Sequence, residues 1–137
     1  TQVLMNMRNT GENLSGRFSL NGLAALLAGA TVVVSNDTGP LHLARSLGIP
    51  NVGIFWAVNA VTAGAVAMSA NRLCIAWNPY CPACGKDCLN GNVHEANGSC
   101  DHGHSFVTGV ATEEVIGHAR DLLALRRTPA LREEIAV

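Results

Sequence analysis

One short turn of the sequence has residues of the right types and spacing to hold an anion. They are Asp37, Thr38, Gly39 and His42. The turn follows the β-branched apolar run at residues 31–34 and precedes a short amphipathic segment, so a buried strand should lead through a polar turn into a helix. This order points free backbone N–H groups and a helix N-terminus at whatever lies above the strand. Phosphate is the most usual occupant of such a place.

Each residue of the turn has a separate use. Thr38 offers a hydroxyl and a backbone N–H, and Gly39 lets a diphosphate approach the backbone because it has no side chain. As an imidazolium, His42 could hold a phosphate oxygen from the first helical turn. Asp37 repels phosphate, so we expect it to cap the helix, to orient His42 or Thr38, or to accept from a sugar hydroxyl. The alternative is structural, since Asp-Thr-Gly-Pro is a good turn and helix start in any protein, and spacing alone does not decide.

A second group with chemical potential lies in a polar segment at about residues 78–105. It consists of Cys81, Cys84, Cys88 and Cys100. Residues 81–85 resemble a zinc knuckle, and four thiolates would close a tetrahedral structural zinc site, with His102 or His104 able to replace one ligand. Such a site would order a segment too long for an ordinary loop. The thiols could instead stay free in a reducing cytosol, oxidise during purification, or pair as two disulfides.

The elements that position these residues follow from the spacing of the apolar residues. Strands are predicted at residues 2–6, 31–34, 51–55 and 73–76. Helices are predicted from the cap Ser19 to Gly29, from Pro40 to Gly48 and from the cap Thr112 onward, with a turn at residues 13–16. Strands that alternate with helices imply a parallel sheet with right-handed crossovers, whose ligands bind at the carboxyl ends of the strands. The polar turn lies at such an end.

The same pattern predicts which residues are buried. We expect residues 31–34 to be covered on both faces, and residues 52–70 to form a buried strand followed by a buried helix or loop. The helix at Pro40 should bury Leu41, Ala44 and Leu47, and the last helix should bury Val115, Ala119 and Leu122, joined by Ile116 and Leu123. Cys74 is expected to be a buried apolar residue, because no paired base suggests a catalytic thiol.

Composition indicates a protein of α/β type with a packed core. Of the 137 residues, 48% are apolar, 4% aromatic and 14% charged, which argues against a disordered chain. The net charge of −1 gives no reason to expect nucleic acid as a partner. No apolar run reaches membrane-spanning length and no signal peptide is visible. Because the chain starts at Thr1, directly before an apolar segment, we expect a fragment of a longer protein.

Four stretches of the sequence resemble one family. They are Asn-Leu-Ser-Gly at 13–16, Leu-Ala-Ala-Leu-Leu at 23–27, residues 32–44 with Asp37-Thr38-Gly39-x-x-His42, and Leu-Gly-Ile-Pro-Asn-Val-Gly-Ile-Phe at 47–55. Together they look like the C-terminal domain of glycosyltransferase family 9, which comprises the ADP-heptose:lipopolysaccharide heptosyltransferases and their relatives. The resemblance covers residues 13–55 well and the last helix loosely, and the Asp-Thr-Gly-x-x-His element is its specific part.

The resemblance implies an α/β fold, a Rossmann-like parallel sheet with flanking helices that is the C-terminal half of a GT-B-type glycosyltransferase. Residues 1–137 would be a partial nucleotide-sugar-binding domain with a Cys-rich insertion at about 78–105. Thr38, Gly39 and His42 would bind phosphate oxygens of the donor, and Asp37 would lie at the donor sugar or orient the turn. The catalytic base is expected in an N-terminal domain that this chain lacks. The catalytic residues are therefore unknown, and the fragment alone is expected to be inactive.

The implied reaction is the metal-independent, inverting transfer of a heptose-like sugar from an ADP-activated donor to a lipopolysaccharide-type, lipid-linked or other glycan acceptor. It needs no cofactor for catalysis, and a structural zinc is a separate expectation. The implied location is the cytoplasm, with a peripheral position at the inner membrane as a further option. In one departure, residues 56–60 read Trp-Ala-Val-Asn-Ala where many relatives have a Gly-Pro-Thr-like turn, so the loop over the donor is expected to differ.

A second interpretation is a non-catalytic scaffold or interaction module on the same fold. In it, the Cys segment serves as a zinc-stabilised knuckle that binds another protein. Zinc content distinguishes the two interpretations, because only the module needs the metal for its activity.

Overall fold

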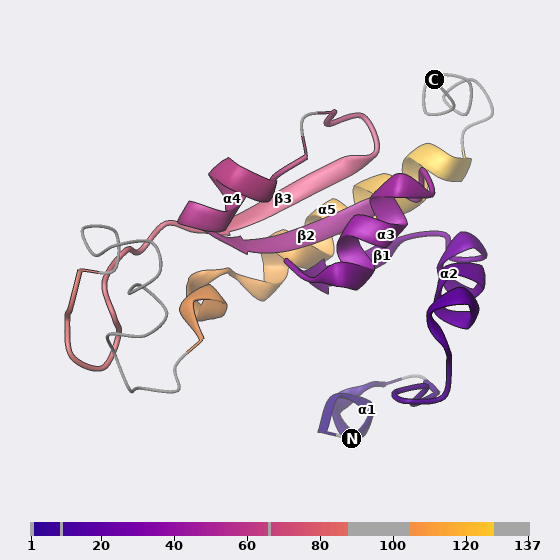
Figure 1. Ribbon diagram of the computed structural model, residues 1–137, viewed down its shortest axis with the longest axis horizontal. Helices are drawn as coiled ribbons and strands as arrows, with labels where there is room; N and C mark the ends of the chain where they lie inside the picture. The colour runs from indigo at the N-terminus through magenta and orange to yellow at the C-terminus, as the bar shows by residue number, and fades with distance from the viewer. Residues whose placement is uncertain (1, 9, 66, 88–104, 128–137) are drawn as a thin grey trace.

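The computed structural model describes the chain except for residues 1, 9, 66, 88–104 and 128–137 (Figure 1). In chain order, the described elements are α1 (Gln2–Asn6), α2 (Leu20–Ala28), β1 (Val33–Asn36), α3 (Gly39–Ser46), β2 (Asn51–Trp56), α4 (Ala57–Ala63), β3 (Asn71–Ala76), the 3-10 helix η1 (Phe106–Gly109) and α5 (Thr112–Arg127). Within this part of the chain, no helix is both long and apolar enough to cross a bilayer.

The sheet is parallel, as predicted, with the strand order β1-β2-β3. Val33 is paired with Asn51, and Asn51 in turn with Asn71. Two strand–helix–strand crossovers, through α3 and through α4, connect the strands in order (Figure 1). The described residues therefore form an α/β, Rossmann-like parallel sheet with flanking helices.

The helices lie on both faces of this sheet. A Cβ placed at Gly53 would touch Leu41 and Arg45, so α3 covers the face of β2 to which residue 53 points. Val52 points the opposite way and packs with Leu122 of α5. The polar turn and α5 therefore belong to opposite sides of the sheet.

Capping sets the bounds of α2 as the sequence predicted. The Ser19 side chain accepts from the Gly22 N–H at 3.3 Å, and the helix ends at the C-cap Gly29, whose N–H is bonded to carbonyls of the last turn. The predicted turn at residues 13–16 is also present, closed by a hydrogen bond from the Arg17 N–H to the Leu14 carbonyl. Leu27 is buried, and α2 packs against α3.

Two clusters form the core on the α5 side. One consists of Val52, Cys74 and Leu122, which confirms the predicted burial of Cys74. The other joins Trp56 to Cys81, with the rings of Trp56 and Phe106 4.7 Å apart between centroids. The indole N–H of Trp56 donates to the Asn78 carbonyl at 3.0 Å, which satisfies the polar atom of this buried ring.

The predicted strand at residues 2–6 is wrong, because these residues form α1. A short apolar run cannot be assigned to strand or helix by periodicity alone. Most of its residues, including Leu4 and Met5, are unbranched at Cβ, and such residues lose little side-chain freedom in a helix.

The predicted burial of residues 31–34 on both faces is also wrong. The strand is Val33–Asn36, and exposure alternates along it, with Val34 47% exposed. Val34 lies on the face that α5 covers, but α5 packs over β2 and β3. An apolar run such as residues 31–34 occurs in central strands and in edge strands alike. The sequence pattern therefore could not show that this strand is covered less on one face.

Three burial predictions for the helices need correction. Leu47 is the C-cap of α3 and is 40% exposed, so the buried stripe holds only Leu41 and Ala44. On α5, Ile116 and Leu123 are 43% and 37% exposed, while Leu122 is buried as predicted. No residue of α4 is buried, although a buried helix or loop was expected there. Apolar composition thus identified these segments without fixing their buried faces.

Candidate functional site

The polar turn lies at the carboxyl end of β1, where the sequence placed it. The Asp37 N–H donates to the Ile54 carbonyl at 3.0 Å, which extends the pairing of β1 with β2 by one step. Thr38 is the N-cap of α3, in extended conformation, and Pro40 occupies the first turn. The N–H groups of Leu41 and His42 then donate back to the Thr38 carbonyl, at 3.0 Å and 3.4 Å. Strand, turn and helix therefore follow one another as predicted.

The Thr38 side chain does not cap the helix. Its hydroxyl donates to the Asn36 carbonyl at 3.1 Å and lies 3.1 Å from the Ser35 hydroxyl. The N-terminus of α3 accordingly has no side-chain cap from Thr38. The space above Gly39 is open, because a Cβ placed there would meet nothing within 4 Å. This arrangement leaves room for an exogenous anion at the first turn of the helix.

Asp37 orients His42, which is one of the roles expected for it. His42 Nε2 lies 3.0 Å from Asp37 Oδ1, and the other carboxylate oxygen accepts from Asn59 Nδ2 at 2.9 Å. The Asp37 side chain is only 14% exposed, whereas that of His42 is 47% exposed. The carboxylate is thus held inside the site with both oxygens engaged, and the imidazole ring reaches the solvent side.

Arg45 places a second cation beneath the turn. Its Nη1 donates to the Ala63 carbonyl at 2.8 Å, and its guanidinium lies over the Phe55 ring, 5.2 Å from the centroid. Burial lowers the pKa of Arg45, while the Asp37 carboxylate opposes this shift. Among the described residues, Nε and Nη2 of Arg45 are buried without a hydrogen-bond partner. The Arg45 guanidinium and the Asp37 carboxylate therefore attract each other.

The sequence interpretation did not identify Asn59 and Arg45 as members of the site. Arg45 follows His42 by three residues on α3, so the two side chains share one side of that helix. Asn59 lies on α4, directly after the carboxyl end of β2. Adjacent parallel strands end at the same edge of a sheet. The position of Asn59 just after β2 was therefore a sequence signal that it could lie close to the polar turn after β1.

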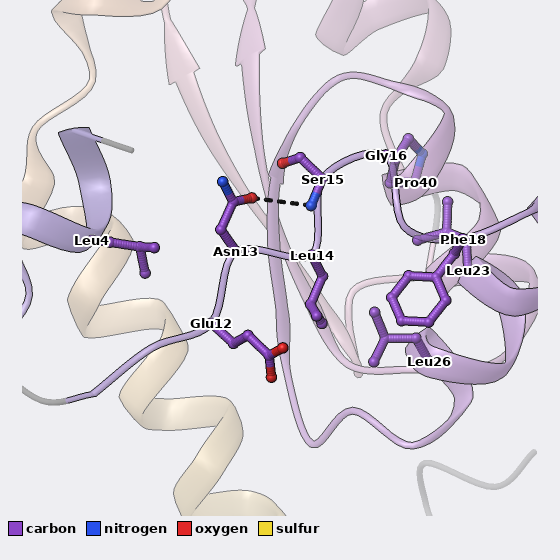
Figure 2. A pocket seen from close by; sticks show the side chains of 10 residues that line it. All are labelled: Leu4, Glu12, Asn13, Leu14, Ser15, Gly16, Phe18, Leu23, Leu26 and Pro40. Carbon is purple, nitrogen blue, oxygen red and sulfur yellow. Dashed lines mark hydrogen bonds between the residues drawn. The ribbon is translucent and has the colours of Figure 1, made fainter.

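A pocket of about 580 Å³ opens beside the start of α3 (Figure 2). Its lining consists of Leu4, Glu12, Asn13, Leu14, Ser15, Gly16, Phe18, Leu23, Leu26 and Pro40. In Figure 2 the side chains of Phe18, Leu23 and Leu26 gather on one side, and Leu14 of the loop before α2 extends toward them. Asn13 Oδ1 accepts from the Ser15 N–H at 3.0 Å, which fixes this loop. Only Pro40 is shared between the pocket and the polar turn, and the sequence did not predict the pocket.

The first half of the cysteine segment forms a tight backbone turn. The Gly85 N–H donates to the Cys81 carbonyl and the Cys81 N–H to the Lys86 carbonyl, both at 2.8 Å. Gly85 has φ +70°, and an antiparallel bridge joins Tyr80 to Asp87. The remaining candidate ligands, Cys88, Cys100, His102 and His104, lie outside the described residues. Zinc binding at Cys81 and Cys84 therefore stays a prediction.

Together, the parallel sheet and the polar turn at its carboxyl edge define a Rossmann-like α/β domain. The family model for glycosyltransferase family 9 (heptosyltransferase) matches residues 1–94. Since this match covers more than half of the chain, the chain belongs to glycosyltransferase family 9, as its sequence motifs suggested.

Two curated relatives are similar over part of the chain. Lipopolysaccharide heptosyltransferase 1 of Pseudomonas aeruginosa is 42% identical over 57 residues, which are 42% of this chain and 16% of that protein. Lipopolysaccharide core heptosyltransferase OpsX of Haemophilus influenzae is 37% identical over 46 residues, which are 34% of this chain and 13% of that protein. The matched regions thus span about a sixth or less of these relatives. No solved structure gave a significant match.

Proposed function

We propose that this chain is the donor-binding part of a glycosyltransferase that moves a heptose-like sugar from an ADP-activated donor to a lipopolysaccharide-type or other glycan acceptor. Membership of family 9 supports sugar transfer, and the names of the two relatives support heptose and lipopolysaccharide. The proposal also includes four finer points. They are the ADP moiety of the donor, the GT-B arrangement of the whole enzyme, its cytoplasmic location and the inactivity of this chain alone.

The observation that carries the proposal is the engagement of Asp37 by His42 and Asn59 at the start of α3. A carboxylate beside a phosphate is unfavourable unless its charge is balanced. Here both oxygens accept hydrogen bonds, and Arg45 adds a nearby positive charge. The open N-terminus of α3 and the imidazolium of His42 are then the groups that meet the diphosphate.

The proposed chemistry is electrostatic stabilisation of the leaving group. As the sugar–phosphate bond breaks, negative charge grows on the diphosphate that departs. The helix N-terminus at Thr38 and Gly39, together with His42, would stabilise this charge without a metal ion. Asp37 keeps His42 oriented and is not assigned as the catalytic base.

The nucleoside of the donor is proposed to bind in the pocket beside Pro40. Its apolar wall of Phe18, Leu23 and Leu26 suits a flat ring, and Glu12 and Asn13 offer polar atoms at its edge. Because Pro40 belongs both to the pocket and to the first turn of α3, a ligand in the pocket lies close to the phosphate end of the site.

Calorimetric titration of the natural protein with ADP tests this function. We expect ADP to bind, and His42→Ala to weaken the binding about tenfold, as loss of one exposed charged hydrogen bond of about 1.4 kcal/mol implies. Ser46→Ala, at the far end of the same helix, is the control and should leave the affinity unchanged. ADP binding that His42→Ala does not affect would contradict the proposed phosphate site.

A second function, a zinc-stabilised interaction module, is supported by the tight turn at Cys81–Gly85 described above. It requires zinc in the purified protein and loss of this zinc on Cys84→Ser. A folded protein that contains no metal would exclude the module.

A further inference from the structure

A group of three potential metal ligands lies on the side of the sheet opposite the polar turn. Cys74 lies on β3, is fully buried, and packs with Val52 and Leu122. Glu114 and His118 lie one turn apart on α5. The sulfur of Cys74, a carboxylate oxygen of Glu114 and a ring nitrogen of His118 are all within 4.8 Å of one another.

Burial and the carboxylate of Glu114 together keep the Cys74 thiol protonated. They raise the pKa of Cys74 to about 11, with burial as the larger cause and a hydrogen bond from the thiol to Glu114 as a further one. A buried cysteine by itself is explained as a small apolar residue. A carboxylate and an imidazole turned toward the same sulfur are not explained by apolar packing.

We propose that Cys74, Glu114 and His118 form a zinc site that fastens α5 to β3. Thiolate, imidazole and carboxylate are the side chains that bind zinc, with metal–ligand distances of about 2.0–2.3 Å. Three ligand atoms within 4.8 Å of one another are close enough for one zinc ion to reach all of them. The site is separate from the donor site and does not depend on the proposed function.

Charge and access both suit a divalent ion. A thiolate and a carboxylate carry two negative charges, which neutralise Zn²⁺, and the neutral imidazole adds no charge. In the binding step, the Zn–S bond forms as the S–H bond breaks, and the proton leaves to the solvent. Glu114 is exposed and His118 is half-buried, so the outer side remains open for metal entry and for a water molecule as fourth ligand.

The role that follows is structural. The ligands come from the last helix and from the strand at one end of the described sheet. A metal held by both would add to the apolar contacts of Leu122 and stabilise the packing of α5 on the sheet. It would not contact His42, because α3 covers the other face.

Cobalt titration of a variant that lacks three of the four competing thiols tests the proposal. The variant carries Cys84→Ser, Cys88→Ser and Cys100→Ser, which removes the knuckle as a metal site and leaves Cys74 in place. We expect one Co²⁺ per chain, with a thiolate-to-cobalt charge-transfer band, and displacement of cobalt by Zn²⁺. His118→Gln and Glu114→Gln should each weaken binding more than about 100-fold, because even partners outside the ligand shell cost about 10–100-fold.

Glu113→Gln is the matched control, since Glu113 precedes Glu114 on the same helix and does not belong to the group. It should leave cobalt affinity unchanged. A folded variant that binds no cobalt, or binding that His118→Gln does not weaken, overturns the proposal. Equal effects of Glu113→Gln and Glu114→Gln do so too, because they would indicate a general effect of charge.

A measurement on the unaltered chain keeps the test independent of the triple variant. The zinc content per chain, measured after dialysis, should fall by one ion on His118→Gln. Zinc should also raise the urea midpoint of the unaltered chain above that of the His118→Gln variant. An unchanged zinc content and an unchanged midpoint would overturn the proposed site even if the triple variant did not fold.

Discussion

Asp37 is hydrogen-bonded to both strand–helix–strand crossovers of the sheet. Its carboxylate accepts from His42 on α3 and from Asn59 on α4, at 3.0 Å and 2.9 Å. A negative charge in a phosphate site could act in two opposite ways. It could repel the ligand, or it could hold a cation that attracts the ligand. The contacts favour the second, and an isosteric substitution separates the two.

We expect Asp37→Asn to weaken ADP binding about tenfold, because His42 loses the charged partner that holds its ring at the first turn of α3. If Asp37 acted by repulsion alone, removing its charge would instead strengthen the binding. Calorimetry with the natural protein shows whether Asp37→Asn weakens or strengthens ADP binding. Asp121→Asn, an exposed carboxylate on α5, is the control for net charge and should have no effect.

The buried thiol of Cys74 makes stability depend on pH in the metal-free protein. Its pKa is raised to about 11 in the fold, against about 8.5 in an unfolded chain, so folding favours the neutral thiol. The contribution is complete below pH about 8.5 and is lost as the pH rises through about 11, and it amounts to at most about 3–4 kcal/mol. Urea unfolding at a series of pH values should show this loss, and Cys74→Ala should reduce the slope. Equal slopes in the two proteins would contradict it.

At the scale of elements, the sequence predicted helix ends and turns best, because these depend on residues close together in the chain. The Ser19 cap and the stop at Gly29 each satisfy orphan backbone groups within a few residues, and the structure shows both. Exposed Leu47 and Ile116 were misassigned because their burial depends on which neighbour the helix meets. Asn59 was missed for the same reason, since its partner is 22 residues away.

The packing of α3 on β2 depends on the absence of a side chain at residue 53. A Cβ there would lie 2.9 Å from Leu41 Cδ2 and would also meet the Phe55 ring. We expect Gly53→Ala to lower the free energy of unfolding by about 1–3 kcal/mol, as overpacking does. Gly117→Ala on α5 meets nothing within 4 Å and should instead stabilise by about 0.5–1 kcal/mol. Urea denaturation measures the free energy of unfolding of both variants. If both substitutions changed it in the same direction, the packing argument would be contradicted.

At the scale of the whole molecule, the described elements leave β1 partly uncovered on the side of the sheet where α5 lies. Sequence predicted the parallel α/β architecture, because alternating strands and helices allow few topologies. It could not show that α5 packs mainly over β2 and β3, since this depends on the path of the chain through space. Val34 on β1 consequently remains 47% exposed.

We expect this exposed face of β1 to promote self-association of the chain at high concentration. Val34→Lys should shift the sedimentation profile toward the monomer, because a charge on an edge strand opposes pairing. Val61→Lys is the matched control, since Val61 is 83% exposed on α4 and lies away from the sheet edge. Equal effects of the two substitutions would indicate charge alone, and a profile that neither changes would exclude association through β1.

The bond between Asp37 and Asn59 also limits how this sequence can diverge. The two residues lie on separate crossovers, yet each satisfies a polar group of the other. An apolar replacement at position 59 leaves a largely buried carboxylate oxygen without its donor, so such a change would be tolerated mainly alongside a change at position 37. Related proteins should therefore vary at these positions in pairs. A donor side chain at position 59 is expected wherever the acidic residue is kept, and greater freedom at position 59 wherever it is lost.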